Sequence, residues 1–112
     1  MSFSLSLPWM PAMLSPNARG NWRKKETSRK KYKSDCYLLA KQARPHFGEG
    51  NIEISILFHP PRKNRDLDNC LAAFKYGLDG IAEAWGVNDR MFRPIKLDFG
   101  PTEKNGRVEV QI

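Results

Sequence analysis

The chain has 112 residues, the size of one small domain, so it can bury only a modest core. Nineteen Lys and Arg residues against twelve Asp and Glu residues give a net charge of +7, which favours a polyanionic partner, most often nucleic acid. No run approaches the roughly 20 apolar residues of a membrane span, and residues 1–14 lack the basic start of a secretion signal. We therefore expect one domain over residues 1–112, acting in the cytoplasm and away from membranes.

The first expected element is a short, half-buried strand, because apolar and serine side chains alternate from Ser2 to Leu7. Pro8 ends it, and prolines and Gly20 predict an irregular loop as far as Asn21.

A basic arm over residues 15–33 is expected to contact DNA, because cations that neutralise phosphates gain affinity by releasing counterions. Trp22 lies within the arm and could stack on an unpaired base, but we expect it to pack on the core. The candidate DNA-binding residues of the arm are Arg19, Arg23, Lys24, Lys25, Arg29 and Lys30.

A helix is expected to begin near Thr27 or Ser28, either of which could cap it, and to end before Pro45. Its apolar face would consist of Tyr32, Cys36, Leu39, Ala40 and Ala43. Cys36 and Cys70 have no metal-binding spacing and read as reduced core residues. No chemical role is expected for His46 or His59.

The clearest strand covers Ile52 to Phe58, where isoleucines alternate with polar residues, and Pro60-Pro61 ends it. A second basic group follows directly, consisting of Arg62, Lys63 and Arg65. These cations are candidates to hold the phosphates of a DNA backbone.

Asp66 and Asp68 follow the second basic group. If the backbone is extended there, both carboxylates leave on the same side and repel each other unless a proton or a cation lies between them. Hard oxygen ligands at this spacing suit Mg²⁺ or Mn²⁺. The alternative is that one aspartate only caps the helix that follows.

An amphipathic helix is expected after the aspartate pair and out to Trp85. Asp68, Lys75 and Asp79 would share one narrow face beside an apolar stripe, which consists of Leu67, Leu71, Phe74, Leu78, Ile81 and Trp85. Lys75 and Asp79 could instead be an ordinary surface pair. Gly86 and Asn88 would end the helix, and Asp89 follows.

Two further strands are expected around Ile95–Phe99 and Val108–Ile112, joined through a turn at Asn105-Gly106. The polar residues of these strands are expected to be solvated and to have no chemical role: Lys96, Asp98, Glu109 and Gln111. The order of elements predicts a small α+β domain with one mixed or largely antiparallel sheet and two packed helices. The acidic site would lie at one edge, between the end of the Ile52–Phe58 strand and the helix start.

These residues carry a resemblance to the RusA family of Holliday junction resolvases, which are small, phage-associated endodeoxyribonucleases. The resemblance covers nearly the whole chain and rests on three motifs: Leu7-Pro8-Trp9-x-Pro11 with Ser15-Pro16-Asn17, Arg65-Asp66-Leu67-Asp68-Asn69, and Lys75-x-x-x-Asp79 with a glycine-led turn to Asp89. The chain departs from the family pattern in two places. Lys75 comes three residues later than the lysine of shorter members, whose position is held by Ala72, and Asn88 replaces the first of two adjacent acids.

The resemblance implies that Asp66, Asp68 and Asp89 are catalytic, metal-binding carboxylates and that Lys75 is the catalytic lysine. Asp79 would orient Lys75. Mg²⁺ would be the cofactor, with Mn²⁺ as a substitute. A homodimer would resolve branched DNA, a four-way junction, by paired symmetric nicks.

Two other functions stay open. One is a basic DNA-binding module without activity, in which the acids hold a structural cation or cap the helix. The other is a phosphatase that uses Asp66 and Asp68 as nucleophile and acid, although such enzymes place the pair directly at a strand end.

Overall fold

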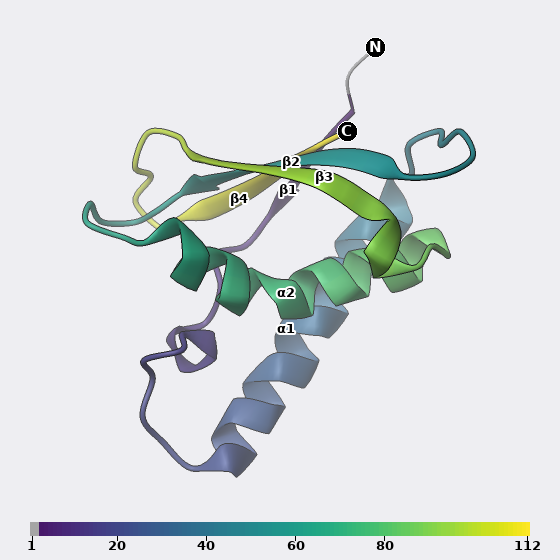
Figure 1. Ribbon diagram of the computed structural model, residues 1–112. Coiled ribbons are helices and arrows are strands. Elements are labelled where there is room, and N and C mark those ends of the chain that lie inside the picture. Colours follow the sequence, from purple (N-terminus) through teal and green to yellow (C-terminus); the bar gives the residue numbers. More distant parts are fainter. Residues whose placement is uncertain (1–2) are drawn as a thin grey trace.

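The computed structural model describes residues 3–112, so Ser2 of the expected first strand lies outside the described residues. A four-stranded mixed sheet carries two long helices on one face, which confirms the predicted α+β class (Figure 1). The elements in chain order are β1 (Ser4–Leu7), η1 (Ala12–Leu14), α1 (Trp22–Gln42), β2 (Ile52–His59), α2 (Leu67–Trp85), η2 (Asp89–Met91), β3 (Phe92–Phe99) and β4 (Arg107–Gln111).

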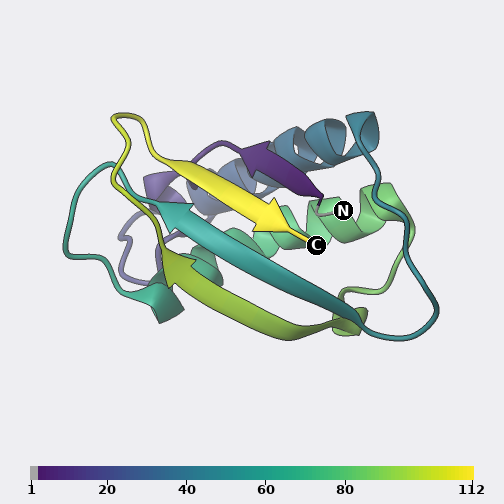
Figure 2. The ribbon, with the colours of Figure 1, turned by 90° about the horizontal axis from the view of Figure 1, so that it is seen from above.

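The spatial order of the strands is β1-β4-β2-β3. β4 is antiparallel to both of its neighbours, whereas β2 and β3 are parallel. A parallel pair needs a crossover, and α2 supplies it by running beneath the sheet from the end of β2 to the start of β3 (Figure 2). The two ends of α2 therefore lie at opposite ends of these strands, which decides where the acidic residues can meet.

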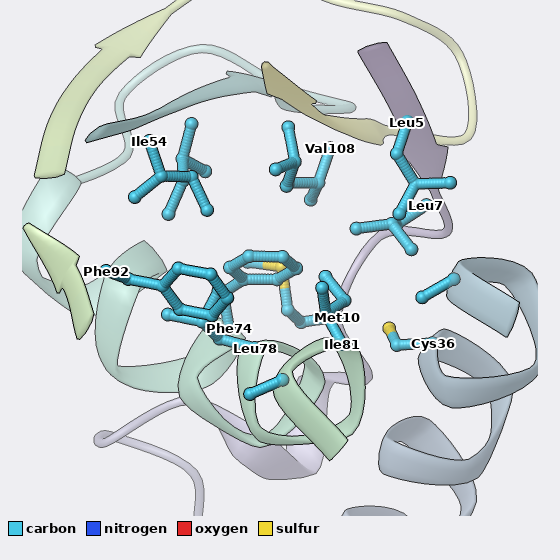
Figure 3. Packing of buried hydrophobic residues seen from close by; sticks show 14 of the residues in the cluster. Leu5, Leu7, Met10, Cys36, Ile54, Phe74, Leu78, Ile81, Phe92 and Val108 are labelled. Carbon is cyan, nitrogen blue, oxygen red and sulfur yellow. The ribbon is translucent and has the colours of Figure 1, made fainter. Parts of the chain in front are cut away.

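The core lies between the helices and one face of the sheet. β2 buries alternate residues on this face because successive side chains of a strand point to opposite sides. Figure 3 shows Phe74, Leu78 and Ile81 of α2 pointing toward Ile54 and Val108 of the sheet. The predicted apolar stripe of α2 is thus confirmed.

The cap of helix α1 is Asn21, six residues before Thr27, which is the first of the two predicted caps. The side chain of Asn21 accepts a hydrogen bond from the backbone N–H of Lys24 at 2.9 Å and caps the helix, while the Thr27 hydroxyl donates to the carbonyl of Arg23 inside it. Residues 22–26 of the basic arm, which were expected to precede the helix, are consequently helical. The expectation that Trp22 packs on the core is wrong, because its side chain is 71% exposed.

The end of α2 is fixed by Gly86, which adopts a left-handed conformation with φ 69°. Just before it, the indole N–H of Trp85 donates to the carbonyls of Ala40 and Ala43, each at 3.1 Å, and so ties α2 to the end of α1. Asn88 then accepts a hydrogen bond from the N–H of Arg90, which shapes the turn that presents Asp89.

Helices α1 and α2 approach closely at Gly80, where an added Cβ would overlap the backbone carbonyl oxygen of Lys33. Gly80→Ala should therefore lower the free energy of unfolding by about 1–3 kcal/mol, although alanine is the better helix former. Gly48→Ala is the control, because among the described residues no atom lies within 4 Å of an added Cβ there. Denaturant unfolding measures both changes, and equal stability of the two variants would contradict the close helix contact.

Candidate functional site

Asp66 and Asp68 lie on either side of the start of α2. Asp66 is the N-cap residue with an extended backbone (φ −100°, ψ 131°), whereas Asp68 is already within the first helical turn. The backbone is therefore extended at Asp66 but not at Asp68, because the helix begins between them. Both side chains are exposed.

The capping alternative is weakened for Asp66, since its side chain makes no capping hydrogen bond. Its carboxylate instead accepts a hydrogen bond from the side-chain amide of Asn69 at 3.3 Å. Within residues 3–112, neither Asp66 nor Asp68 has a cationic partner within 4.0 Å. Their oxygens are thus free to meet a hard cation, with water filling its remaining positions.

A cleft of about 230 Å³ separates the start of α2 from the amino-terminal loop. The loop is held on the core by buried Met10 and Leu14 and by a 2.7 Å hydrogen bond from the hydroxyl of Tyr32 to the carbonyl of Pro8. Polar side chains from both sides line the cleft: Ser15, Asn17, Asn64, Arg65, Asp66 and Asn69.

The cleft brings together two of the motifs that carry the family resemblance, although they are about fifty residues apart in sequence. Sequence reasoning assigned no site role to Ser15, Asn17 or Asn69. The sequence did contain an indication of this site, the polar Ser-Pro-Asn motif in the proline-rich loop. A loop that only connects two elements needs no particular polar residues, so such a motif suggests a functional role.

Lys75 and Asp79 are exposed on α2 with Asp68, as predicted. Lys75 lies seven residues beyond Asp68, about 10 Å along the helix axis. Asp79 lies close enough to Asp89 for a hydrogen bond between the two carboxyl groups when one is protonated, and the charge of Lys75 also acts on Asp79. Partial burial, this hydrogen bond and the charge of Asp89 raise the pKa of Asp79. That Asp79 orients Lys75 stays a prediction.

Asp89 begins η2 shortly after the end of α2, whereas Asp66 and Asp68 lie at the start of this helix. Because Asp89 adjoins Asp79, it is separated from Asp68 by about 16 Å along the axis of the helix. Across residues 3–112, no three acidic, histidine or cysteine side chains are close enough to bind one metal ion. A single copy of the chain therefore does not assemble the three predicted carboxylates into one site.

The predicted DNA-binding cations form two groups, and all of them are exposed except Lys25, which is half-buried. Arg62, Lys63 and Arg65 lie in the loop before Asp66, where Asn64 turns the backbone with φ 66°. The other group lies in the loop before α1 and in its first turns. Among these, Arg29 pairs with Glu26 at 3.4 Å and its guanidinium lies over the ring of Tyr76.

A polar network that sequence reasoning missed lies on the open face of the sheet, around His59, which is only 5% exposed. Arg107 donates hydrogen bonds to the carboxylate of Glu103 at 3.0–3.2 Å and to the hydroxyl of Ser6. Its Nη2 lies 3.1 Å from Nε2 of His59. Since a guanidinium only donates, the ring proton of His59 belongs on Nδ1, which faces the carbonyl of Pro101 at 3.0 Å.

The network fastens the loop of residues 100–106 to the sheet. This loop lines a groove together with Lys63 and Arg65, so the network helps to place the second basic group. Glu109 was expected to be solvated, but its side chain is largely buried and accepts a hydrogen bond from Ser4 at 2.8 Å. In the sequence, the one indication was a histidine directly before Pro60, at the end of the predicted strand.

The network should make folding sensitive to acid. Hydrogen bonds from Arg107 hold the pKa of Glu103 below its ordinary value of 4.5, and the Ser4 hydroxyl lowers that of Glu109. A carboxylate with a depressed pKa stabilises the fold above its ordinary pKa, and this stability is lost as the pH falls through the folded value.

Glu103→Gln should consequently lower the melting temperature at pH 7, and the difference from the unmutated chain should shrink below about pH 4.5. Glu49→Gln, which removes an exposed carboxylate before β2, is the control and should change little at any pH. A Glu103→Gln chain as stable as the unmutated one at pH 7 would remove the stabilising role of the network.

Cys36 and Cys70 are free and buried, as expected of reduced core residues. Burial raises the pKa of both thiols, to about 12 for Cys36. None of the helices in residues 3–112 is long and apolar enough to span a membrane.

Comparison with known proteins finds a related sequence. No model of a known protein family matches the chain. An uncharacterized protein of Xylella fastidiosa (strain Temecula1) is 41% identical over 115 residues, which span 97% of this chain and 74% of that protein. The similarity thus extends over nearly the whole domain, including both ends of α2.

Proposed function

We propose that this chain, which belongs to the same family as the Xylella fastidiosa protein, is a metal-dependent endodeoxyribonuclease that cuts branched DNA. The resemblance of its motifs to the RusA resolvases makes a four-way junction the substrate and paired symmetric nicks the product. The protein would act in the cytoplasm, where its DNA substrate lies and where free cysteines such as Cys36 and Cys70 stay reduced.

The observation that carries the proposal is the exposed pair Asp66 and Asp68, which has no cationic partner in the described chain although three cations lie in the loop directly before it. A surface pair that served only stability would be expected to use such neighbours. Because the cations of this loop are not paired with Asp66 or Asp68, they can bind the DNA phosphates on either side of a phosphodiester bond that lies at the two aspartates.

The donor set at the start of α2 fits Mg²⁺, with Mn²⁺ as a substitute, because it offers two carboxylates on an open surface. When bound there, the ion would lower the pKa of a water molecule and offset charge on the phosphate in the transition state. Asp66 and Asp68 would hold it, and the hydrogen bond from Asn69 would orient the Asp66 carboxylate. Lys75, about two turns along the same helix, would contact a phosphate oxygen of the bound strand.

Asp89 can join Asp66 and Asp68 only if a second copy supplies it, because α2 holds the two ends of one chain too far apart. A two-fold dimer with its α2 helices antiparallel would place the Asp89 of each copy near the Asp66 and Asp68 of the other. It would also create two equivalent sites, as paired nicks require. Homodimerisation is therefore part of the proposal.

The direct test is cleavage of a synthetic mobile four-way junction beside a linear duplex of the same sequence, in Mg²⁺, Mn²⁺ and EDTA. Symmetric nicks in the junction alone, absent in EDTA, are the expected result. Tight junction binding without nicks in either metal would refute the nuclease and leave a DNA-binding module. In that case, a rise in melting temperature with Mg²⁺ would identify a structural cation site.

A further inference from the structure

Trp22 is the most exposed of the large hydrophobic side chains among the described residues, at 71%, and it lies in the first turn of α1. Helical spacing puts it on the same side of α1 as Arg29, Tyr32 and Cys36. Tyr32 and Cys36 are buried, and Arg29 lies over Tyr76 of α2. Trp22 lies seven residues before Arg29, about two turns nearer the start of α1. Figure 1 shows that this end of α1 projects beyond α2.

The indole is nevertheless held on a well-defined backbone. The Asn21 cap begins the helix directly before it, and the Thr27 hydroxyl bonds to the carbonyl of Arg23 within the same turns. Exposing a tryptophan loses the free energy that its burial would supply. The other two tryptophans are covered instead: Trp85 is fully buried and Trp9 is half-buried.

The surroundings of Trp22 are strongly positive. In residues 19–33, Glu26 is the one acid, and Arg29 pairs with it. Among residues 3–112, no carboxylate lies within 4.0 Å of the other early cations of this stretch, which are Arg19, Arg23, Lys24, Lys25 and Lys30. An exposed aromatic ring among unpaired cations matches a single nucleic-acid strand, whose bases offer flat faces and whose phosphates offer charge.

We infer that Trp22 is a stacking platform for an unpaired base of the DNA substrate, with Arg23 and Lys24 binding the adjacent phosphates. A fully paired duplex offers no free base face in its interior, so the contact favours DNA with unpaired bases, such as those exposed where a junction branches. The inference rests on the proposed function for the identity of the substrate as DNA, but it concerns binding and needs no metal.

The test is the binding of an oligothymidylate and of a blunt duplex to the full chain in EDTA, over a range of salt concentrations. Trp22→Ala should weaken oligothymidylate binding about tenfold while changing duplex affinity by less than about twofold. Trp22→Phe should restore most of the loss because its ring can still stack. Lys24→Ala should instead weaken the binding of both ligands. It should also reduce the slope of log affinity against log salt concentration by about one, whereas Trp22→Ala should leave this slope unchanged.

Leu38→Ala is the matched control, since Leu38 is also exposed on α1, at 56%, but points away from Trp22 and should not affect either ligand. Circular dichroism checks that each variant stays folded. Equal affinity of Trp22→Ala and the unmutated chain for oligothymidylate, or equal loss on both ligands, would overturn the stacking role. If stacking fails but the chain still cuts the junction, the nuclease proposal is unaffected. If Trp22 stacks on oligothymidylate but the chain cuts no DNA, the stacking role of Trp22 is unaffected.

Discussion

Asp68→Asn is expected to retain junction binding and to lose at least about a hundredfold in cleavage rate. The substitution keeps the shape of the side chain but removes the charge that would hold the metal, and even outer-sphere partners of metal sites contribute 10- to 100-fold. Loss of a negative charge near phosphates should leave affinity equal or slightly higher. Junction binding in EDTA and single-turnover cleavage in Mg²⁺ measure the two quantities separately.

The control for this substitution is Asp98→Asn, which removes the same charge from an exposed residue of β3. The carboxylate of Asp98 accepts a hydrogen bond from the N–H of Phe99 at 2.8 Å, which an asparagine side chain can also accept. Asp98→Asn should cut at the unmutated rate. Cleavage by Asp68→Asn at that same rate would refute the assignment of the acidic pair.

Mixing two inactive variants should restore activity if Asp89 acts on the partner's site. Asp68→Asn and Asp89→Asn chains would each be inactive alone. In a mixed dimer, one site would collect both substitutions and the other would collect none, so about half of the nicking capacity of that dimer returns. If all three aspartates acted within one chain, both sites of the mixed dimer would be damaged and no activity would return.

The mixing experiment needs subunit exchange, which co-expression of the two variants with different affinity tags provides. A mixed sample of Asp66→Asn and Asp68→Asn chains is the control, because these substitutions fall in the same half of the site and cannot complement each other. Recovery in the first mixture and none in the control would identify a shared site. No recovery in either, from dimers shown to be mixed, would remove the partner's Asp89 from the mechanism.

The local elements were predictable because their signals are local. The 3.6-residue apolar period of α2, its glycine end at Gly86 and the alternation in β2 gave boundaries that the structure confirms within a few residues. The predicted start of α1 was wrong for two reasons. Thr27 and Asn21 are both good capping residues, and the run of cations before Thr27 was interpreted as part of a loop. Only the hydrogen bond from Lys24 to Asn21 distinguishes them.

The sequence by itself determined the α+β class, the net positive charge of the chain and the common helix face of Asp68, Lys75 and Asp79. These features depend only on composition and on the periodic patterns of helices and strands. The tertiary structure alone decided four other features. It inserted β4 between β1 and β2, exposed Trp22 beyond the reach of α2, and placed the Ser15–Asn17 motif beside Asp66. It also set Asp89 at the opposite end of α2 from Asp68, because a helix that crosses between parallel strands must span the length of the sheet.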